Sequence, residues 1–219
     1  MLEALPGTLM LAGTALVFTL LYALPAGIIS ALNRNKWVDY LLRAASFVGV
    51  SMPTFWLGLV LIYIFGLKLG LVPIATSRVT PIGVILPAAT LAVVVGSKYM
   101  RQVRLVILEE MEKDYVIGAR ARGVSEMKIL FGHILPNAVL PLITILGVVM
   151  GWLLGGVAVV EMVFSWPGLG NMAIYAITMR DYPLIEGFVL WVALAYMCIN
   201  ALIDASYILL DPRLKRERA

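Results

Sequence analysis

Long apolar runs alternate with short polar stretches along the chain. Five runs carry few charges and come close to, or exceed, the roughly 20 helical residues that cross a hydrocarbon core. They are residues 9–32, 44–69, 82–99, 139–163 and 184–210. None alternates apolar and polar residues throughout, as a strand of a transmembrane barrel does. Because a helix also satisfies its own backbone in lipid, the runs predict five transmembrane helices, of which the third is the shortest.

Composition supports a membrane location for the whole chain. Hydrophobic residues make up 62% and charged residues 14% of the 219 residues, and the mean hydropathy is +0.96. In an ordinary soluble domain about a quarter of the residues are charged. We therefore expect an all-α membrane protein in which residues 1–219 form a single transmembrane domain.

The basic residues between the runs predict an orientation. With five alternating spans, 14 of the 17 Lys and Arg residues fall on the side of the third loop and the C-terminus. Because cytoplasmic loops carry the excess of Lys and Arg, we expect this side in the cytoplasm and the N-terminus outside. The net charge of +4 follows from these loops, and contact with anionic lipids accounts for them more simply than nucleic-acid binding does.

The third loop differs from the rest of the chain in its mixed composition. The stretch "EEMEKDYVIGARARG" combines acids, bases and small residues. Asp114 is placed to cap a helix, and Gly118 and Ala119 on that helix would let another surface approach closely. Gly123 can take a positive φ and end the helix. From the residues alone, this loop, about 109–135, is either a docking element or a long loop at the membrane interface.

A second short helix is expected after the glycine. Ser125 is placed as its N-cap, and Glu126 in its first turn interacts favourably with the helix dipole. Lys128 is expected to face water. An apolar face follows at the spacing i, i+3, i+4 and i+7, made of Met127, Leu130, Phe131 and Ile134.

Motifs in and around this loop resemble those of a known family. "GARARG" followed by "HILP" resembles the cytoplasmic "EAA" loop of binding-protein-dependent ABC importer permeases. Ala119, Gly123, Leu135 and Pro136 stand at the matching positions, and Ile117 stands where the acid of the name would be. "EMVFSWPGLG", "RDYPLIEG" and "LLDPRLKR" look like the dipeptide, oligopeptide and nickel branch. The resemblance covers most of the chain and implies the helical bundle of a type I ABC importer permease.

The resemblance also implies a function and a set of partners. Such a permease forms half of a translocation pathway, works by alternating access, and is not itself an enzyme. It pairs with a second homologous permease, two cytoplasmic ATPase subunits that bind the ATP, and an extracytoplasmic substrate-binding protein, in the inner membrane of a prokaryote. No cofactor or metal ion is implied for this chain. The residues expected to couple to the ATPase are Asp114, Tyr115, Ala119, Arg120, Gly123 and Glu126.

Residues 164–183 are expected outside the membrane and are too long for a tight turn. By resemblance they form an external segment that folds back toward the pathway and faces the substrate-binding protein. Its rigid turn would consist of Trp166, Pro167, Gly168 and Gly170. The alternative is an aromatic interface anchor followed by a Pro-Gly turn. Members of this branch also carry a further N-terminal span, so we expect either a shortened chain or a span supplied from elsewhere.

Polar residues in or near the last two spans are candidates for the pathway, because ionisable groups in a membrane are costly. They are Glu161, Glu186, Asn200 and Asp204. They would meet a peptide amine or a metal cation in transit, or else form an internal pair or reach the membrane surface. The G-x-x-x-G-x-x-x-G spacing of Gly147, Gly151 and Gly155 predicts close helix contact, either at the interface between permeases or without a functional role.

Two other classes of function remain open alternatives. A passive channel would need no ATPase-docking surface. An intramembrane enzyme would need a catalytic pair at bilayer depth, which Asp204 alone does not supply. The sequence lacks the G-x-x-x-x-G-K-[ST] phosphate-binding motif, and its one histidine, His133, has no neighbouring ligands for a metal site. The motifs are shared by dipeptide, oligopeptide, glutathione and nickel systems.

Overall fold

The computed structural model describes residues 1–74 and 78–210, of which 154–156 and 207–210 by backbone alone. All regular elements in these residues are helical. Five are long, and seven are short helices or π-helical turns. In chain order they are α1 (Leu5–Leu32), α2 (Trp37–Ser51), α3 (Thr54–Leu61), η1 (Ile62–Lys68), α4 (Ile85–Met111), α5 (Asp114–Ala121), α6 (Glu126–Ile129), η2 (Leu130–Ile134), α7 (Leu135–Gly156), α8 (Ala158–Val163), α9 (Leu169–Met179) and α10 (Tyr182–Leu210).

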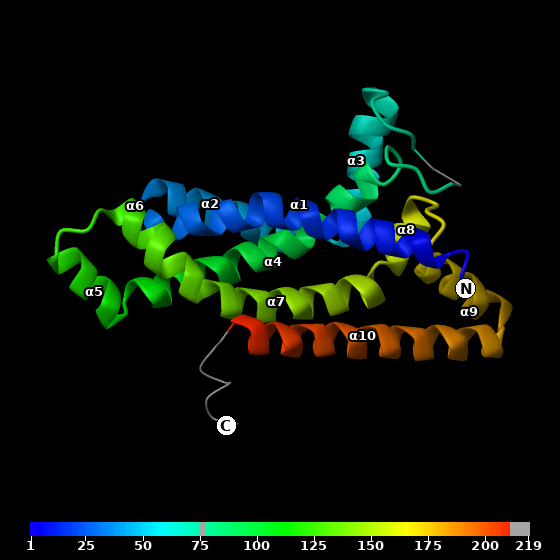
Figure 1. Cartoon of the computed structure of the whole chain (residues 1–219). Coiled ribbons are helices and arrows are strands. Elements are labelled where there is room, and N and C mark those ends of the chain that lie inside the picture. The colour runs from blue at the N-terminus through cyan, green and yellow to red at the C-terminus, as the bar shows by residue number, and fades with distance from the viewer. Residues whose placement is uncertain (75–77, 211–219) are drawn as a thin grey trace.

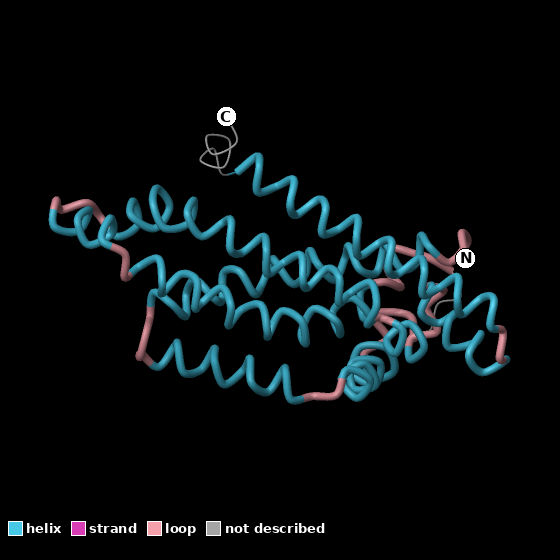
Figure 2. Tube along the Cα trace, turned by 90° about the horizontal axis from the view of Figure 1, so that it is seen from below, coloured by secondary structure: helices cyan, strands magenta, loops and turns pink. Residues whose placement is uncertain are grey.

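The long helices α1, α2, α4, α7 and α10 run along one common direction (Figures 1 and 2). Small residues let them approach closely. A Cβ placed on Gly27 of α1 would lie 2.6 Å from the Cβ of Val103 on α4 and 2.8 Å from the carbonyl oxygen of Met100. A side chain at this position would therefore force the two helices apart.

Among the described residues, three helices are long and apolar enough to cross a membrane, namely Leu5–Leu32, Glu126–Leu153 and Tyr182–Ser206. The expected span over 44–69 is bent, because the helices Trp37–Ser51 and Thr54–Lys68 meet at an angle of 101°, as in a broken span or a re-entrant loop. Pro53 explains the break: it favours an extended conformation in the preceding residue, and Met52 has φ −78° and ψ 128°.

The shortest expected span, 82–99, belongs to a longer helix. α4 continues through Lys98, Arg101 and Arg104, so these three cations lie on a helix and not in a loop. Downstream, Pro136 and Pro141 lie in the first turn and the interior of α7 and do not terminate it. The π-helical turn η2 joins α6 directly to α7, so this helical stretch continues into the bundle.

The glycine pattern in α7 serves contact within the chain. A Cβ on Gly147 would lie 1.8 Å from Cδ1 of Ile203, and one on Gly151 would lie 2.3 Å from the ring of Tyr196. Both partners are on α10, so the predicted close helix contact is confirmed at these two glycines. The surroundings of Gly155 lie outside the described residues.

Two apolar cores lie at different levels of the bundle. One includes Val116, Ala119 and Ile129, from α5 and α6, packed against α1, α4 and α7. The other includes Leu11 of α1 and Trp166, together with side chains of α4, α7 and α8. Figure 1 places α5 and α6 at one end of the bundle and the N-terminus, α8 and α9 at the other. The loop and the external segment are thus at opposite ends.

Candidate coupling site

The start of α5 is held by a buried carboxylate on α4. Glu110 is only 5% exposed; its Oε1 is paired with Lys113 Nζ, and its Oε2 accepts a hydrogen bond of 2.7 Å from Tyr115 Oη. Burial and the neighbouring carboxylate raise the pKa of Tyr115 to about 12, so the phenol stays protonated at neutral pH and donates. Asp114 is the first residue of α5, and Lys113 holds the N-cap position, so the predicted cap at Asp114 is wrong.

The inner face of α5 packs into the chain's own core. Val116 and Ala119 are buried and lie in one cluster with Ile107 of α4 and Ile129 of α6. The methyl group of Ala119 therefore faces inward, and the expected approach of a partner to this part of α5 stays a prediction. Gly118 is half-buried, and a Cβ there would meet only the guanidinium of Arg122, at 3.4 Å.

The turn between α5 and α6 has the geometry predicted for a glycine-terminated helix. Gly123 has φ +77°, which confirms the expected positive φ. Its N–H donates to the carbonyl of Arg120 at 2.9 Å, and the N–H of Val124 donates to that of Ala119 at 3.2 Å. These two bonds form a Schellman motif and satisfy carbonyls at the end of α5. Ser125 is the N-cap residue of α6 in backbone conformation, without a side-chain capping bond.

An ion pair bridges the two helices across this turn. Arg120 Nε and Nη2 donate to the two carboxylate oxygens of Glu126 at 2.8 and 3.0 Å. The hydrogen bonds from Arg120 lower the pKa of the Glu126 carboxyl below its ordinary value. Both side chains are substantially exposed, so the pair sets the geometry of the turn more than its stability.

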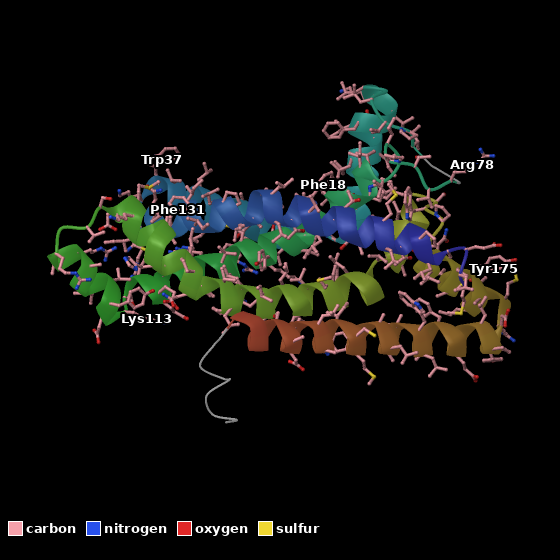
Figure 3. All side chains as sticks on the ribbon, in the orientation of Figure 1. Phe18, Trp37, Arg78, Lys113, Phe131 and Tyr175 are labelled. Atoms are coloured by element: carbon pink, nitrogen blue, oxygen red, sulfur yellow. The ribbon has the colours of Figure 1, made fainter. Side chains whose placement is uncertain are left out.

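Three large apolar side chains of α5, α6 and η2 are exposed. Ile117 is 55% exposed, and Met127 and Phe131 are each 62% exposed. Figure 3 shows Phe131 and Lys113 at the end of the bundle that carries α5 and α6. The predicted apolar face is therefore divided, because Leu130 and Ile134 are buried while Met127 and Phe131 point outward. The signal for this exposed set was the presence of large apolar residues within a charged loop.

At the opposite end, Glu161 caps the helix of the external segment. Its carboxylate accepts hydrogen bonds from Thr8 Oγ1 at 2.7 Å and from the N–H of Asn171 at 2.9 Å. Thr8 Oγ1 in turn accepts the N–H of Leu169 at 2.8 Å. Glu161 is fully buried, and its carboxylate caps the N-terminus of α9; its part in the pathway stays a prediction.

The predicted turn of the external segment surrounds this carboxylate. Trp166 is fully buried, and its Nε1 donates to the carbonyl of Gly7 at 2.9 Å. A Cβ on Gly168 would lie within 2.1–2.4 Å of the Glu161 carboxylate, and one on Gly170 would lie 2.5 Å from Cα of Ala158. Trp166, Pro167, Gly168 and Gly170 thus form a tightly packed turn docked on the start of α1.

The other pathway candidates lie along α10. Glu186 and Asp204 are exposed, and Asn200 is half-buried. Fourteen residues separate Glu186 from Asn200, which is about 21 Å along a helix. The structure therefore places Asn200 and Asp204 one turn apart on one face and does not bring Glu186 to them.

A buried ion pair that sequence reading missed joins three helices. Asp39, in the first turn of α2, is fully buried and accepts two hydrogen bonds of 2.8 Å from Arg104 of α4. It also accepts one of 2.6 Å from Ser30 Oγ of α1. The signal was a single acid in a loop whose other charges are basic. Arg104 is thus a structural cation rather than a free loop cation.

Comparison with protein families gives one match over most of the chain. Residues 23–216 match the model of the binding-protein-dependent transport system inner membrane component. This range includes α5, α6 and the external segment.

Two relatives from Escherichia coli strain K12 extend this match. The chain is 38% identical to the glutathione transport system permease protein GsiC over 208 residues, which cover 95% of this chain and 68% of GsiC. It is 37% identical to the probable D,D-dipeptide transport system permease protein DdpB over 239 residues, which cover 96% of this chain and 70% of DdpB.

Solved structures with a similar fold come from ABC transporters. The MetNI methionine ABC transporter, in an inward-facing conformation, aligns with a TM-score of 0.77 at 19% identity, covering 96% of this chain and 95% of the matched one. An amino acid ABC transporter aligns with a TM-score of 0.67 at 19% identity, covering 93% and 91%. These likenesses support the fold, and the match over residues 23–216 together with the two relatives shows that the chain belongs to the binding-protein-dependent transport system inner membrane components, the permease subunits of ABC importers.

Proposed function

We propose that this permease forms half of the pathway of an ATP-driven importer for small peptides, and that α5 and α6 dock on a cytoplasmic ATPase subunit. The exposed residues of α5, α6 and η2 support this role, because they include the apolar Ile117, Met127 and Phe131, and the Arg120–Glu126 pair fixes the turn between the helices. A small apolar patch with a polar rim is suited to contact with another protein.

The way in which α5 is mounted supports mechanical coupling. Its inner residues Val116 and Ala119 pack in the same core as side chains of α4 and α7. Because Glu110 of α4 holds Tyr115 and Lys113 directly, a displacement of α5 that keeps these bonds also moves the end of α4. The docking helices therefore act on the bundle as a rigid lever, as alternating access requires.

The arrangement of the ends supports the proposed orientation. We place α5, α6 and the C-terminus in the cytoplasm, because Lys113, Arg120, Arg122 and Lys128 lie at that end and the C-terminal sequence carries four more basic residues. The external segment then faces outward, where Trp166 and Gly168 form the compact turn that would meet the substrate-binding protein. The second permease would complete the pathway alongside this chain.

The solute class is proposed from the relatives. GsiC is named for glutathione and DdpB for D,D-dipeptides, so a short peptide or a peptide-like solute is the shared chemistry. Neither name supports nickel, which the sequence motifs also allowed.

Substitution of Gly123 tests the coupling role. In Gly123→Arg, the positive φ disfavours any residue with a side chain, and a bulky cation is added to the docking face. We expect the permease to insert in the membrane, while co-purification with the ATPase and ATP-dependent peptide uptake fall by more than about tenfold, as a loss of about 1.4 kcal/mol or more would produce.

The matched control is Gly123→Asn, because Asn is the residue that best tolerates this left-handed conformation after glycine. We expect it to keep most of the uptake. Full uptake and normal ATPase binding by Gly123→Arg would contradict the docking model. Equal loss in both variants would point to the glycine itself and not to the docking face.

A further inference from the structure

Helix α4 is the most enclosed long helix, and it opens to the surface along one polar strip. Beyond Ile85 at its start, its exposed residues are Lys98, Gln102, Leu105 and Glu109. Their spacing of i, i+4, i+7 and i+11 places them on one face of the helix. Three of the four are polar, whereas a helix face in contact with lipid tails is apolar.

The end of this strip at Lys98 lies in the middle of the bundle. Lys98 is the central residue of the 27 residues of α4. Its ammonium lies 5.7 Å from the centre of the ring of Trp152 on α7. The neighbouring Gly151 packs on Tyr196, the central residue of the 29 residues of α10. The positions along α4 and α10 both place Lys98 near the middle of the bundle's length, about 20 Å along α4 from either end.

Lys98 borders a small cavity and has no acidic partner. The cavity has a volume of about 180 Å³ and is lined by Val95, Lys98, Val148, Val149 and Trp152. Within the described part of the chain, none of the ion pairs includes Lys98. The Trp152 ring attracts the ammonium through its negative face without neutralising it. The site thus offers an uncompensated positive charge beside an aromatic surface.

A lysine at this level requires an explanation. An ionisable side chain at mid-membrane depth is costly unless it faces water or a countercharge. Lipid phosphates lie at the edge of a hydrocarbon core about 30 Å thick, roughly 15 Å from its centre, and a lysine side chain is shorter than that. The Lys98 ammonium lies between α4 and α7, and the polar residues Gln102 and Glu109 follow on the same face of α4. This arrangement indicates a water-filled path instead.

We propose that the strip of Lys98, Gln102, Leu105 and Glu109 lines the translocation pathway and that Lys98 binds the carboxylate of the solute in transit. This inference rests on the proposed function, since a small peptide carries a free carboxylate at neutral pH. The 180 Å³ cavity is large enough for a carboxylate and a few waters, each of which occupies about 30 Å³ in the liquid. The strip would then lead the solute from the middle of the bundle toward α5.

Thiol labelling tests whether the strip faces water. The chain has one cysteine, Cys198, so Cys198→Ala supplies a cysteine-free background. In the assembled importer in proteoliposomes, Lys98→Cys and Gln102→Cys should react with a charged thiosulfonate at least about tenfold faster than Leu194→Cys. Leu194 is 61% exposed on the apolar outer face of α10. Equally slow reaction of all three would overturn the pathway assignment, because lipid or a dry contact with a second permease would then cover the strip.

Charge substitution tests the carboxylate site. The probes are dialanine and its C-terminal amide, each supplied with saturating binding protein. Lys98→Gln should reduce ATP-dependent uptake of dialanine about tenfold, as loss of one charged hydrogen bond does, and that of the amide less than about twofold. Lys98→Arg should retain most of the uptake, and so should Lys68→Gln, which removes an exposed lysine of η1 away from the strip.

Equal loss with both probes in Lys98→Gln would make Lys98 a structural residue, and no loss with either would exclude the site. If the wild-type importer takes up neither probe, the proposed solute class fails. The labelling experiment still decides in that case whether Lys98 faces the pathway, because it needs no transport.

Discussion

The phenol of Tyr115 and the carboxylate of Glu110 connect α5 to the bundle by one hydrogen bond of 2.7 Å. Glu110 is nearly fully buried, so each of its oxygens depends on a specific donor, Lys113 or Tyr115. At this scale the coupling site depends on satisfying one buried charge. Loss of either donor leaves part of that charge unpaired, which costs more than the bond itself contributes.

Removing the phenol oxygen should weaken the start of α5. For Tyr115→Phe we expect a loss of about 1–3 kcal/mol, because an oxygen of the Glu110 carboxylate is left without a donor. For a chain of this size, each kcal/mol lowers the thermal midpoint by about 2–4 °C, which a melting curve of the purified importer in detergent would detect. Tyr175→Phe is the control, because Tyr175 is 62% exposed. The same midpoint for both variants would contradict the role of Glu110.

The Arg120–Glu126 pair should depend on complementary charge. Each single reversal, Arg120→Glu or Glu126→Arg, places like charges across the turn and should reduce ATPase binding. The double reversal should restore more of it than the individual effects predict. If the loss of ATPase binding in the double variant equals the sum of the losses in the two single variants, the pair has no part in shaping the turn.

The pH dependence of this pair has a definite sign. Arg120 lowers the pKa of Glu126, so the contribution of the pair is present above the ordinary carboxyl value of 4.5 and is lost as pH falls through the lower value of the folded state. The difference in ATPase binding between wild type and Glu126→Gln should therefore stay constant from about pH 6 to 8. A difference that disappears within this range would contradict the assignment.

At the scale of elements, the external segment is joined to α1 rather than simply following α7. Glu161 and Thr8 cap α9 together, and Trp166 bonds to the carbonyl of Gly7. Fully buried polar groups are paired at each of these contacts, so the segment behaves as one packed unit with the start of α1. A displacement of the external segment should therefore also displace the start of α1.

The close approach at Gly7 can be tested on a single helix. In Gly7→Ala, the new Cβ would lie 2.0 Å from the carbonyl oxygen of Pro167, so the backbone must shift, at a cost of about 1–3 kcal/mol. Gly13→Ala on the same helix is the control, because a Cβ there has open space. We expect a lower thermal midpoint for Gly7→Ala and an equal or higher one for Gly13→Ala. Equal midpoints would mean that α1 and the segment are not locked together.

At the scale of the whole molecule, the two candidate contact regions lie at opposite ends of the bundle (Figures 1 and 3). α4 and α7 connect them, since α4 leads into α5 and α7 begins after α6. The buried pair of Asp39 and Arg104 ties α2 to α4, and Ser30 adds α1. A displacement of the end that carries α5 and α6 would thus be distributed over several long helices.

The proposed orientation predicts which end each side of the membrane can reach. In a Cys198→Ala background, Tyr175→Cys should react with an impermeant maleimide in intact cells whose outer barrier has been permeabilised. Ser125→Cys should react only after the inner membrane is opened, because both residues are exposed but lie at opposite ends. The reverse labelling pattern would show that the chain has the opposite orientation in the membrane.

Features that depend on residues adjacent in the sequence were predictable. The helical bundle followed from hydropathy, and the end of α5 from Gly123, whose positive φ the structure confirms. Predictions that required knowing which side of a helix is covered were less successful. The sequence did not indicate that Ala119 is buried in the chain's own core or that Glu161 caps α9.

The sequence by itself determined the membrane class, the helical fold, the family and the turn between α5 and α6, because hydropathy, glycine conformation and motif spacing are properties of consecutive residues. Only the tertiary structure decided the roles of individual charges. Thr8 and Glu161, 153 positions apart, meet in one cap, and Asp39 and Arg104 meet across two helices. The reason is physical: burial and pairing of a charge depend on which helix faces pack together, and a single helix does not specify its neighbours.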